Sequence, residues 1–333
     1  MIASSTMMRK EFVFFFLAIS MFDVYGADVS DLDTALQNTY HACVNIDENL
    51  HDLKVLAGIN TTVTAIGTGL GIGANAVGVA KSKIDKEIEG AFVEMRDMLN
   101  EYQGPDPTEQ QRQNWLQAVY NKIDAINWND DSFSEKKKAD LKKIHDIKSR
   151  IEEQEEQSKK LGNWRTGLLG GNTVTNVAGA IISSQTINKD DIQGQVNACI
   201  AATRDLGRAM MAAKLNGQDT SEAAQIYNAC SEYEYVDISP IIKRGKGVVI
   251  SSSIGAVTGA AGTITSALAN SKGVRDNNTD AGRDKEKNLN TSSNVLAGGA
   301  AIASATATVF NATQVSAIKK VTAISQKCTE VLK

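Results

Sequence analysis

Four cysteines are the residues of this 333-residue chain with the clearest chemistry: Cys43, Cys199, Cys230 and Cys328. Thiols can bind a metal as thiolates or join in pairs as disulfides. An even number of cysteines in an exported protein favours disulfides. Four cysteines allow three pairings, and a preference among them depends on the elements that carry them.

A metal site is the competing chemistry near the first cysteine. His41 and Cys43 lie two residues apart, and His51 follows, which supplies half of a ligand set. A structural metal site needs about four ligands, and no second cluster of ligand residues has metal spacing. We therefore expect no bound metal and no cofactor.

A glycine motif between Gly69 and Ala74 has the G-x-G-x-x-A form of a dinucleotide-binding loop. Such a loop follows a strand and brings backbone amides to a pyrophosphate. No strand pattern precedes this motif, and the surrounding segment resembles three others that lack it. We expect these glycines to serve helix packing instead.

Catalytic signatures are otherwise missing from the sequence. There is no G-x-S-x-G hydrolase elbow, and the chain has only three histidines. The acidic run at residues 152–156 lies beside Lys159 and Lys160, as on a solvated helix face. A net charge of −4 gives no electrostatic reason to expect nucleic acid. We expect a protein that is not an enzyme and has no evident small-molecule substrate.

The N-terminus has the three parts of a secretory signal. Arg9 and Lys10 precede an apolar run at residues 12–22, and a small residue, Gly26, stands at the expected cleavage site. The apolar run is too short to span a membrane comfortably. We therefore expect a signal peptide over residues 1–26. The mature protein is expected to be exported to the periplasm, the cell surface or the medium, with membrane association possible.

Four long segments without a charged residue must position the cysteines. They cover residues 55–80, 166–188, 247–271 and 288–318 and are rich in Gly, Ala, Ser and Thr. Small residues at spacings of three and four allow close approach of helix backbones. The residues expected to line these helix contacts are Gly67, Gly71, Gly78, Gly255, Gly259, Gly262, Ala297, Ala301 and Ala305.

The chain divides into two related halves, each with two such segments. The sequence Tyr-His-Ala-Cys that ends at Cys43 is echoed by Tyr-Asn-Ala-Cys ending at Cys230. We expect a first helical hairpin over residues 27–215 and a second over residues 216–333. In an antiparallel hairpin the two cysteines of one half lie at the same end. This favours Cys43 with Cys199 and Cys230 with Cys328, and leaves the other two pairings open.

The connection at residues 81–165 is expected to be helical and charged. Apolar residues recur in it at helical spacing. Its stripes are Ile84, Ile88, Phe92, Met95 and Leu99, then Trp115, Leu116, Val119, Tyr120, Ile123 and Ile126, then Leu141, Ile144, Ile147 and Ile151. A turn cluster at residues 104–107 interrupts it, and Thr108 with Gln111 indicates a capping box. The last helix, dense in Lys and Glu, is expected to be an exposed, coiled-coil-like extension.

The fold expected from these patterns is all-α: an elongated bundle of two antiparallel helical hairpins with a charged coiled-coil-like extension. Segments of about 25 residues are long enough to cross a bilayer. They also contain polar residues that lipid penalises: Asn60, Asn75, Asn172, Asn176, Ser251, Ser252, Ser253, Asn294, Asn311 and Gln314. The sequence therefore favours a water-soluble bundle and leaves membrane insertion open.

Two functions follow from these two alternatives. The first is an exported, non-enzymatic structural or interaction protein of the cell envelope or surface, with a protein partner or self-association. The alternative is a membrane-inserting protein, which in one form makes pores. In composition alone, the segments resemble glycine-rich pore-forming hairpins.

Overall fold

Helices form all the regular secondary structure in the described part of the chain, which confirms the expected all-α class. The computed structural model describes residues 31–100, 108–126, 134–188, 192–275 and 280–333. The expected signal peptide at residues 1–26 and the turn cluster at residues 104–107 lie outside these ranges.

Long helices dominate the described chain. Each of α3, α5 and α10 exceeds 50 residues, and α3 carries the first small-residue segment and the first apolar stripe without interruption. No proline falls inside these three helices, so nothing in the backbone forces a break. The helices are α2 (Leu32–Cys43), α3 (Ile46–Asn100), α4 (Glu109–Lys122), α5 (Glu135–Asn188), α6 (Ile192–Leu215), α7 (Ser221–Cys230), α8 (Ser239–Ala269), α9 (Lys272–Arg275) and α10 (Asp280–Leu332), with short 3-10 helices at Ile123–Ala125 and Ser231–Tyr235.

The chain forms two compact units, and each draws on both halves of the sequence. Unit 1 comprises Met1–Val55, Asn188–Ile241 and Ser316–Lys333, and unit 2 comprises Leu56–Ile187 and Ile242–Val315. The cysteines belong to unit 1. Almost all of the four small-residue segments belongs to unit 2.

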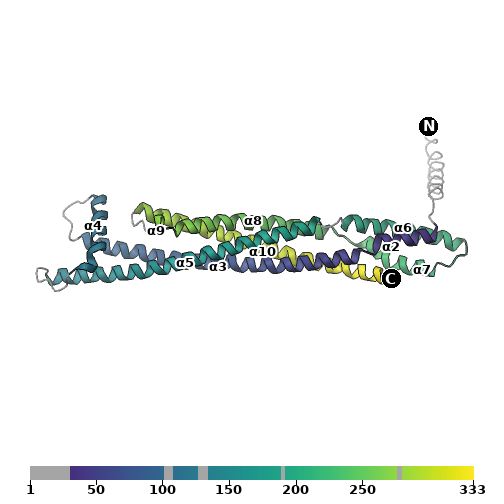
Figure 1. Ribbon diagram of the computed structural model, residues 1–333, viewed down its shortest axis with the longest axis horizontal. Coiled ribbons are helices and arrows are strands. Elements are labelled where there is room, and N and C mark those ends of the chain that lie inside the picture. Colours follow the sequence, from purple (N-terminus) through teal and green to yellow (C-terminus); the bar gives the residue numbers. More distant parts are fainter. Residues whose placement is uncertain (1–30, 101–107, 127–133, 189–191, 276–279) are drawn as a thin grey trace, which may run out of the picture. The chain divides into compact units, whose positions relative to one another are not determined.

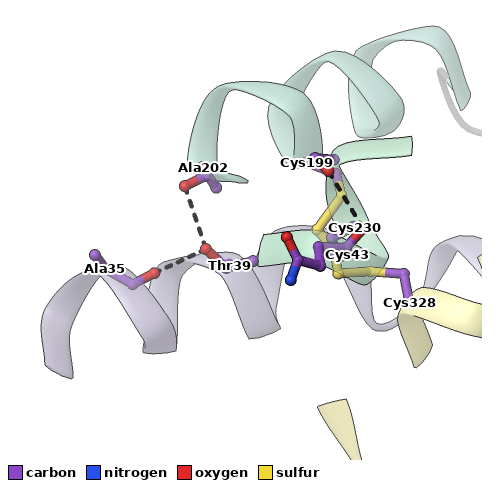
Figure 2. Close-up of a disulfide and its surroundings, with 9 residues drawn as sticks. Ala35, Thr39, Cys43, Cys199, Ala202, Cys230 and Cys328 are labelled. Carbon is purple, nitrogen blue, oxygen red and sulfur yellow. Dashed lines mark hydrogen bonds between the residues drawn. A yellow bond between two sulfur atoms is a disulfide. The ribbon is translucent and has the colours of Figure 1, made fainter. Parts of the chain in front are cut away.

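Unit 1 is held together by two disulfides, Cys43–Cys199 and Cys230–Cys328, the pairing that the spacing of the cysteines favours. The two bridges lie beside each other (Figure 2), and all four cysteines are fully buried. Nearby, the Thr39 hydroxyl donates to the backbone carbonyls of Ala35 and Ala202. This ties α2 to α6. The bridges span 156 and 98 residues of chain, for which the chain-entropy account gives about 4–5 kcal/mol each.

Unit 1 also contains a sharp helix end and a buried phenol. Gly217 has φ +74°, and the amides of Gly217 and Gln218 donate to the carbonyls of Lys214 and Ala213. This is the Schellman arrangement, which glycine permits because it lacks a Cβ. The Tyr233 side chain is fully buried, and burial raises its pKa to about 12.

Unit 2 contains a four-helix bundle made from α3, α5, α8 and α10 (Figure 1). The inward residues of α3 recur at spacings of three and four, which is the heptad repeat of closely packed helices. They are Asn60, Thr64, Gly67, Gly71, Ala74, Gly78 and Lys81. The small-residue segments of the other three helices supply the facing positions.

Neighbouring helices in the bundle are antiparallel. Asn60 near the start of the α3 segment bonds to Ser183 near the end of the α5 segment. Gly247 of α8 faces Phe310 of α10, whereas Gly262 further along α8 faces Leu296. Pairs of this kind fix the register of the bundle without large apolar side chains.

Several expected packing glycines meet a neighbouring helix at close range. A Cβ atom on Gly71 would lie 2.9 Å from the Cα of Ala301, and one on Gly259 would lie 2.7 Å from Thr173 Oγ1. Gly67, Gly78, Gly255 and Gly262 face side chains of neighbouring helices in the same way. Ala297 is fully buried and Ala305 is half-buried.

Replacing Gly71 by alanine should destabilise the bundle, whereas replacing Gly69 should not. A methyl group at Gly71 meets backbone, and overpacking costs about 1–3 kcal/mol. At Gly69 the space is open, so alanine only adds helix propensity, worth about 1 kcal/mol. Thermal melts followed by circular dichroism should therefore shift in opposite directions. Equal shifts would show that Gly71 does not lie against α10.

The helical extension of unit 2, residues 81–165, has a conventional apolar core. The three predicted stripes meet there: Phe92, Met95, Leu99, Ile123, Ile144, Ile147 and Ile151 are buried. The last helix is therefore not simply exposed as expected, since its isoleucines contact α3. The predicted capping box of Thr108 and Gln111 is present and starts α4. Burial, reinforced by Glu155, Glu152 and Asp124, raises the pKa of Tyr120 well above its usual range.

Candidate functional site

The interior of the four-helix bundle is polar, which is the reverse of an ordinary protein core. Most inward positions hold amides, hydroxyls or residues no larger than alanine. In the described part of unit 2, Leu169 and Val248 are the bulky apolar side chains of the small-residue segments that are buried there, and the buried Ile318 at the end of the fourth segment belongs to unit 1. Apart from Asn290, the buried polar residues of these segments are Asn60, Thr64, Asn172, Asn176, Ser183, Thr186, Ser251, Ser252, Ser266, Ser293, Ser304, Asn311 and Gln314, and we call this set the polar seam.

Asparagine side chains link the helices across the seam in two groups. In the first, Asn60 donates to Ser183 and to Asn311 Oδ1, and Asn311 donates to Thr64. This group joins α3, α5 and α10.

The second asparagine group lies further along α5. Asn172 donates to the carbonyl of Gly67 and to Ser304, and Asn176 also donates to Ser304. Hydrogen bonds of this kind between helices are typical of helices that associate in lipid, where they contribute about 1 kcal/mol each.

A buried charged network closes one end of the bundle. Lys81 is 2 % exposed, and its Nζ lies 2.9 Å from Asp85 Oδ2 and 2.9 Å from Glu286 Oε1. Asp85 also accepts hydrogen bonds from Ser158 (2.6 Å) and Asn290 (3.1 Å). The network thus ties α3 to α5 and α10, and its carboxylates have the partners that a buried charge requires.

Arg165 adds a second buried cation beside this network. Its side chain is fully buried, and Nη2 donates to the carbonyl of Asn290 at 3.2 Å. Its Nε and Nη1 have no hydrogen-bond partner within the described residues. Arg165 also interacts electrostatically with Asp85, and the formal charges of Lys81, Arg165, Asp85 and Glu286 sum to zero.

An open cavity of about 330 Å³ adjoins the charged network. Asp85, Ser158, Glu286 and Asn290 belong to both the network and the cavity wall. The Arg283 guanidinium covers the Phe92 ring at 5.0 Å on the same wall. The polar end of the bundle therefore borders an open cavity.

The outer face of the bundle is uncharged and mostly apolar, and it also exposes polar side chains such as Thr62, Gln185, Ser253 and Thr306. No charged residue occurs in residues 56–80, 166–187, 247–269 or 288–315. The large side chains exposed on this face by 45 % or more are Ile59, Ile66, Ile72, Val79, Val174, Val177, Ile181, Ile250, Ile254, Val257, Ile264, Leu268, Val295, Ile302 and Val309. By length and composition, α3, α8 and α10 each contain a stretch that could cross a membrane.

Other residues that the sequence singled out lie elsewhere. The Gly69–Ala74 motif lies in the middle of α3 and not in a loop. The Sγ atoms of Cys43, Cys199 and Cys328 lie within 4.8 Å of one another, but they are bonded in disulfides. In the acidic run, Glu152 pairs with Lys148 and Glu156 with Lys160.

The charged network was not predicted from the sequence. Lys81 and Arg165 stand at the borders of uncharged segments, and they looked like ordinary flanking charges. The position of Lys81 in the helical repeat could have predicted its burial. Lys81 continues the three-and-four spacing of the inward residues of α3.

Comparisons with known proteins found no matching family model, no similar curated protein and no similar solved structure. A functional interpretation therefore depends on the geometry described above.

Proposed function

We propose that this protein resides in a membrane, with the four-helix bundle of unit 2 as its membrane-spanning part. The observation that carries the proposal is the inverted bundle, which is mostly polar inside and mostly apolar and uncharged outside. Water would leave this exterior of Ile, Val and Leu unfavourably exposed, and contiguous exposed apolar surface is uncommon on soluble monomers. Lipid would stabilise it.

The lengths of the uncharged segments fit this role. Each covers about 22 residues or more, and a helix of about 20 residues crosses the hydrocarbon core. The segment of α5 is the most polar, but its asparagines lie inside the bundle. Val174, Val177 and Ile181 form its outer face. We propose that α5 crosses together with the others, as two helical hairpins, α3 with α5 and α8 with α10.

The interior polar groups also favour a membrane protein. Buried amides and hydroxyls have partners on neighbouring helices, which is how polar side chains are accommodated in lipid. In this proposal the small residues let four backbones approach closely where apolar packing supplies little driving force. These features favour the membrane-inserting protein, which the sequence left as the alternative, over the soluble structural or interaction protein.

A defined topology follows from the connectivity. The chain passes between unit 1 and unit 2 at Leu56, Ile187, Ile242 and Val315, and all four points belong to one end of the bundle. Residues 81–165 connect α3 to α5 at the other end. A spanning bundle therefore puts unit 1 and residues 81–165 in different compartments. For an exported chain, the disulfides of unit 1 are on the oxidising side.

Protease accessibility tests this topology. A recognition sequence for a specific protease is inserted after Gly217, in the exposed turn of unit 1, or after Ser134, before α5. In intact cells only the Gly217 site should be cut, and detergent should expose both. Cleavage at both sites without detergent would favour the soluble structural or interaction protein instead.

A further inference from the structure

The polar seam is interrupted at one level by an apolar layer. Ala74 of α3, Leu169 of α5 and Ala297 of α10 form a buried apolar cluster. On the fourth helix, a Cβ at Gly262 would lie 3.5 Å from both Leu169 methyl carbons. Leu169 is fully buried and is the only bulky member. We call these four residues the Leu169 layer.

Buried polar atoms without a partner occur on both sides of the Leu169 layer. On one side are Asn60 Oδ1 and Ser252 Oγ. On the other are Asn294 Oδ1 and two nitrogens of Arg165. Asn60, Ser252 and Arg165 are each 1 % exposed or less. Such atoms cost about 1–3 kcal/mol each unless something satisfies them, and internal water is the usual partner.

The unpaired atoms lie close against two glycines. A Cβ on Gly179 would lie 3.2 Å from Asn60 Oδ1 and 3.2 Å from Ser252 Oγ, so both oxygens lie beside the same residue of α5. A Cβ on Gly78 would overlap Asn294 Oδ1 and lie 3.0 Å from Arg165 Nε, so these two groups also lie together. Each pair supplies two of the polar partners that an internal water molecule needs.

We propose that the bundle interior is a pathway for water and protons that the Leu169 layer holds closed. The inference rests on the proposed membrane location. Protons pass along chains of hydrogen-bonded water molecules and hydroxyl groups, and the polar seam supplies hydroxyl groups. An apolar constriction interrupts such a chain because it excludes water. The cavity beside Asp85 and Glu286 is the aqueous mouth at one end.

Hydrated ions are excluded from this pathway by the packing. The Cβ position of Gly71 lies 2.9 Å from the backbone of Ala301, so α3 and α10 are in direct contact. No room remains between them for an ion with its water shell. Polar groups buried in a spanning bundle commonly mark a proton or ion route, and here the geometry selects protons.

Proton uptake into vesicles tests the proposal. The full mature chain is reconstituted with a pH-sensitive dye inside, and valinomycin with a potassium gradient drives proton entry. Leu169→Ser should raise the rate about tenfold or more over the wild type. The matched control Leu268→Ser, on the outer face of α8 at 50 % exposure, should leave the rate unchanged.

Flotation of the same vesicles separates the two hypotheses. If the protein floats with lipid but Leu169→Ser and wild type conduct protons equally, the pathway is wrong and the membrane location stands. If the protein does not float, both are wrong. Should Leu169→Ser lose its helical circular dichroism, Leu169→Ala replaces it with the same expected increase. An equal rise in potassium flux without valinomycin would overturn the restriction to protons.

Discussion

Replacing Lys81 by methionine should lower the free energy of unfolding by about 3–5 kcal/mol, the cost of breaking a buried ion pair. Lys81 Nζ lies 2.9 Å from a carboxylate oxygen of both Asp85 and Glu286, and its loss leaves two carboxylates with no ammonium between them. For a domain of this size the melting temperature should fall by about 10 °C. Thermal unfolding in mild detergent, followed by circular dichroism, measures the change.

Lys83→Met is the matched control for this effect. Lys83 lies two residues away on the same helix and is exposed, so its loss should change stability by less than about 1 kcal/mol. Adding Glu286→Gln to Lys81→Met should recover part of the loss, because one of the two unpaired charges is removed. Equal melting temperatures for Lys81→Met and Lys83→Met would show that the charged network does not form.

The apolar stripes of the extension were predictable from sequence because their spacing is strong. Phe92, Met95 and Leu99 recur at three and four residues, and large apolar side chains at that spacing have few alternatives to a buried helix face. The capping box at Thr108 was recognisable for a similar reason, since two side chains at fixed spacing satisfy the helix end.

The polarity of the bundle interior could not be predicted in the same way. In the small-residue segments, glycine, alanine, serine and threonine occupy inner and outer positions alike, so hydropathy shows little periodicity. Asn60 and Asn172 looked like a penalty against membrane insertion when their direction was unknown. In the structure both asparagines lie inside the bundle, and Ile59 and Val174 lie outside. With this arrangement Asn60 and Asn172 favour membrane insertion.

The charged network depends on contacts between residues far apart in the chain. Lys81 and Glu286 are 205 positions apart, and they meet only because α3 and α10 pack side by side. The two compact units could not be predicted from the sequence for the same reason. Halves of the sequence were expected to fold as separate hairpins, whereas each compact unit combines segments from both halves.

Cysteines placed on the outer face of the bundle should be unreactive toward a water-soluble maleimide in intact membranes. Val257 and Ile302 are each 70 % exposed, so a thiol there is open to its surroundings. Maleimides react with the thiolate, which forms in water and not in hydrocarbon. The native cysteines are paired in disulfides and give no background.

Labelling of these variants tests most directly whether lipid covers the bundle. In membranes opened to admit the reagent to both sides, Lys142→Cys, on an exposed position of the extension, should label fully. Val257→Cys and Ile302→Cys should label only after denaturation in SDS. If both react as fast as Lys142→Cys in the intact membrane fraction, water surrounds the bundle and the membrane-spanning account is wrong.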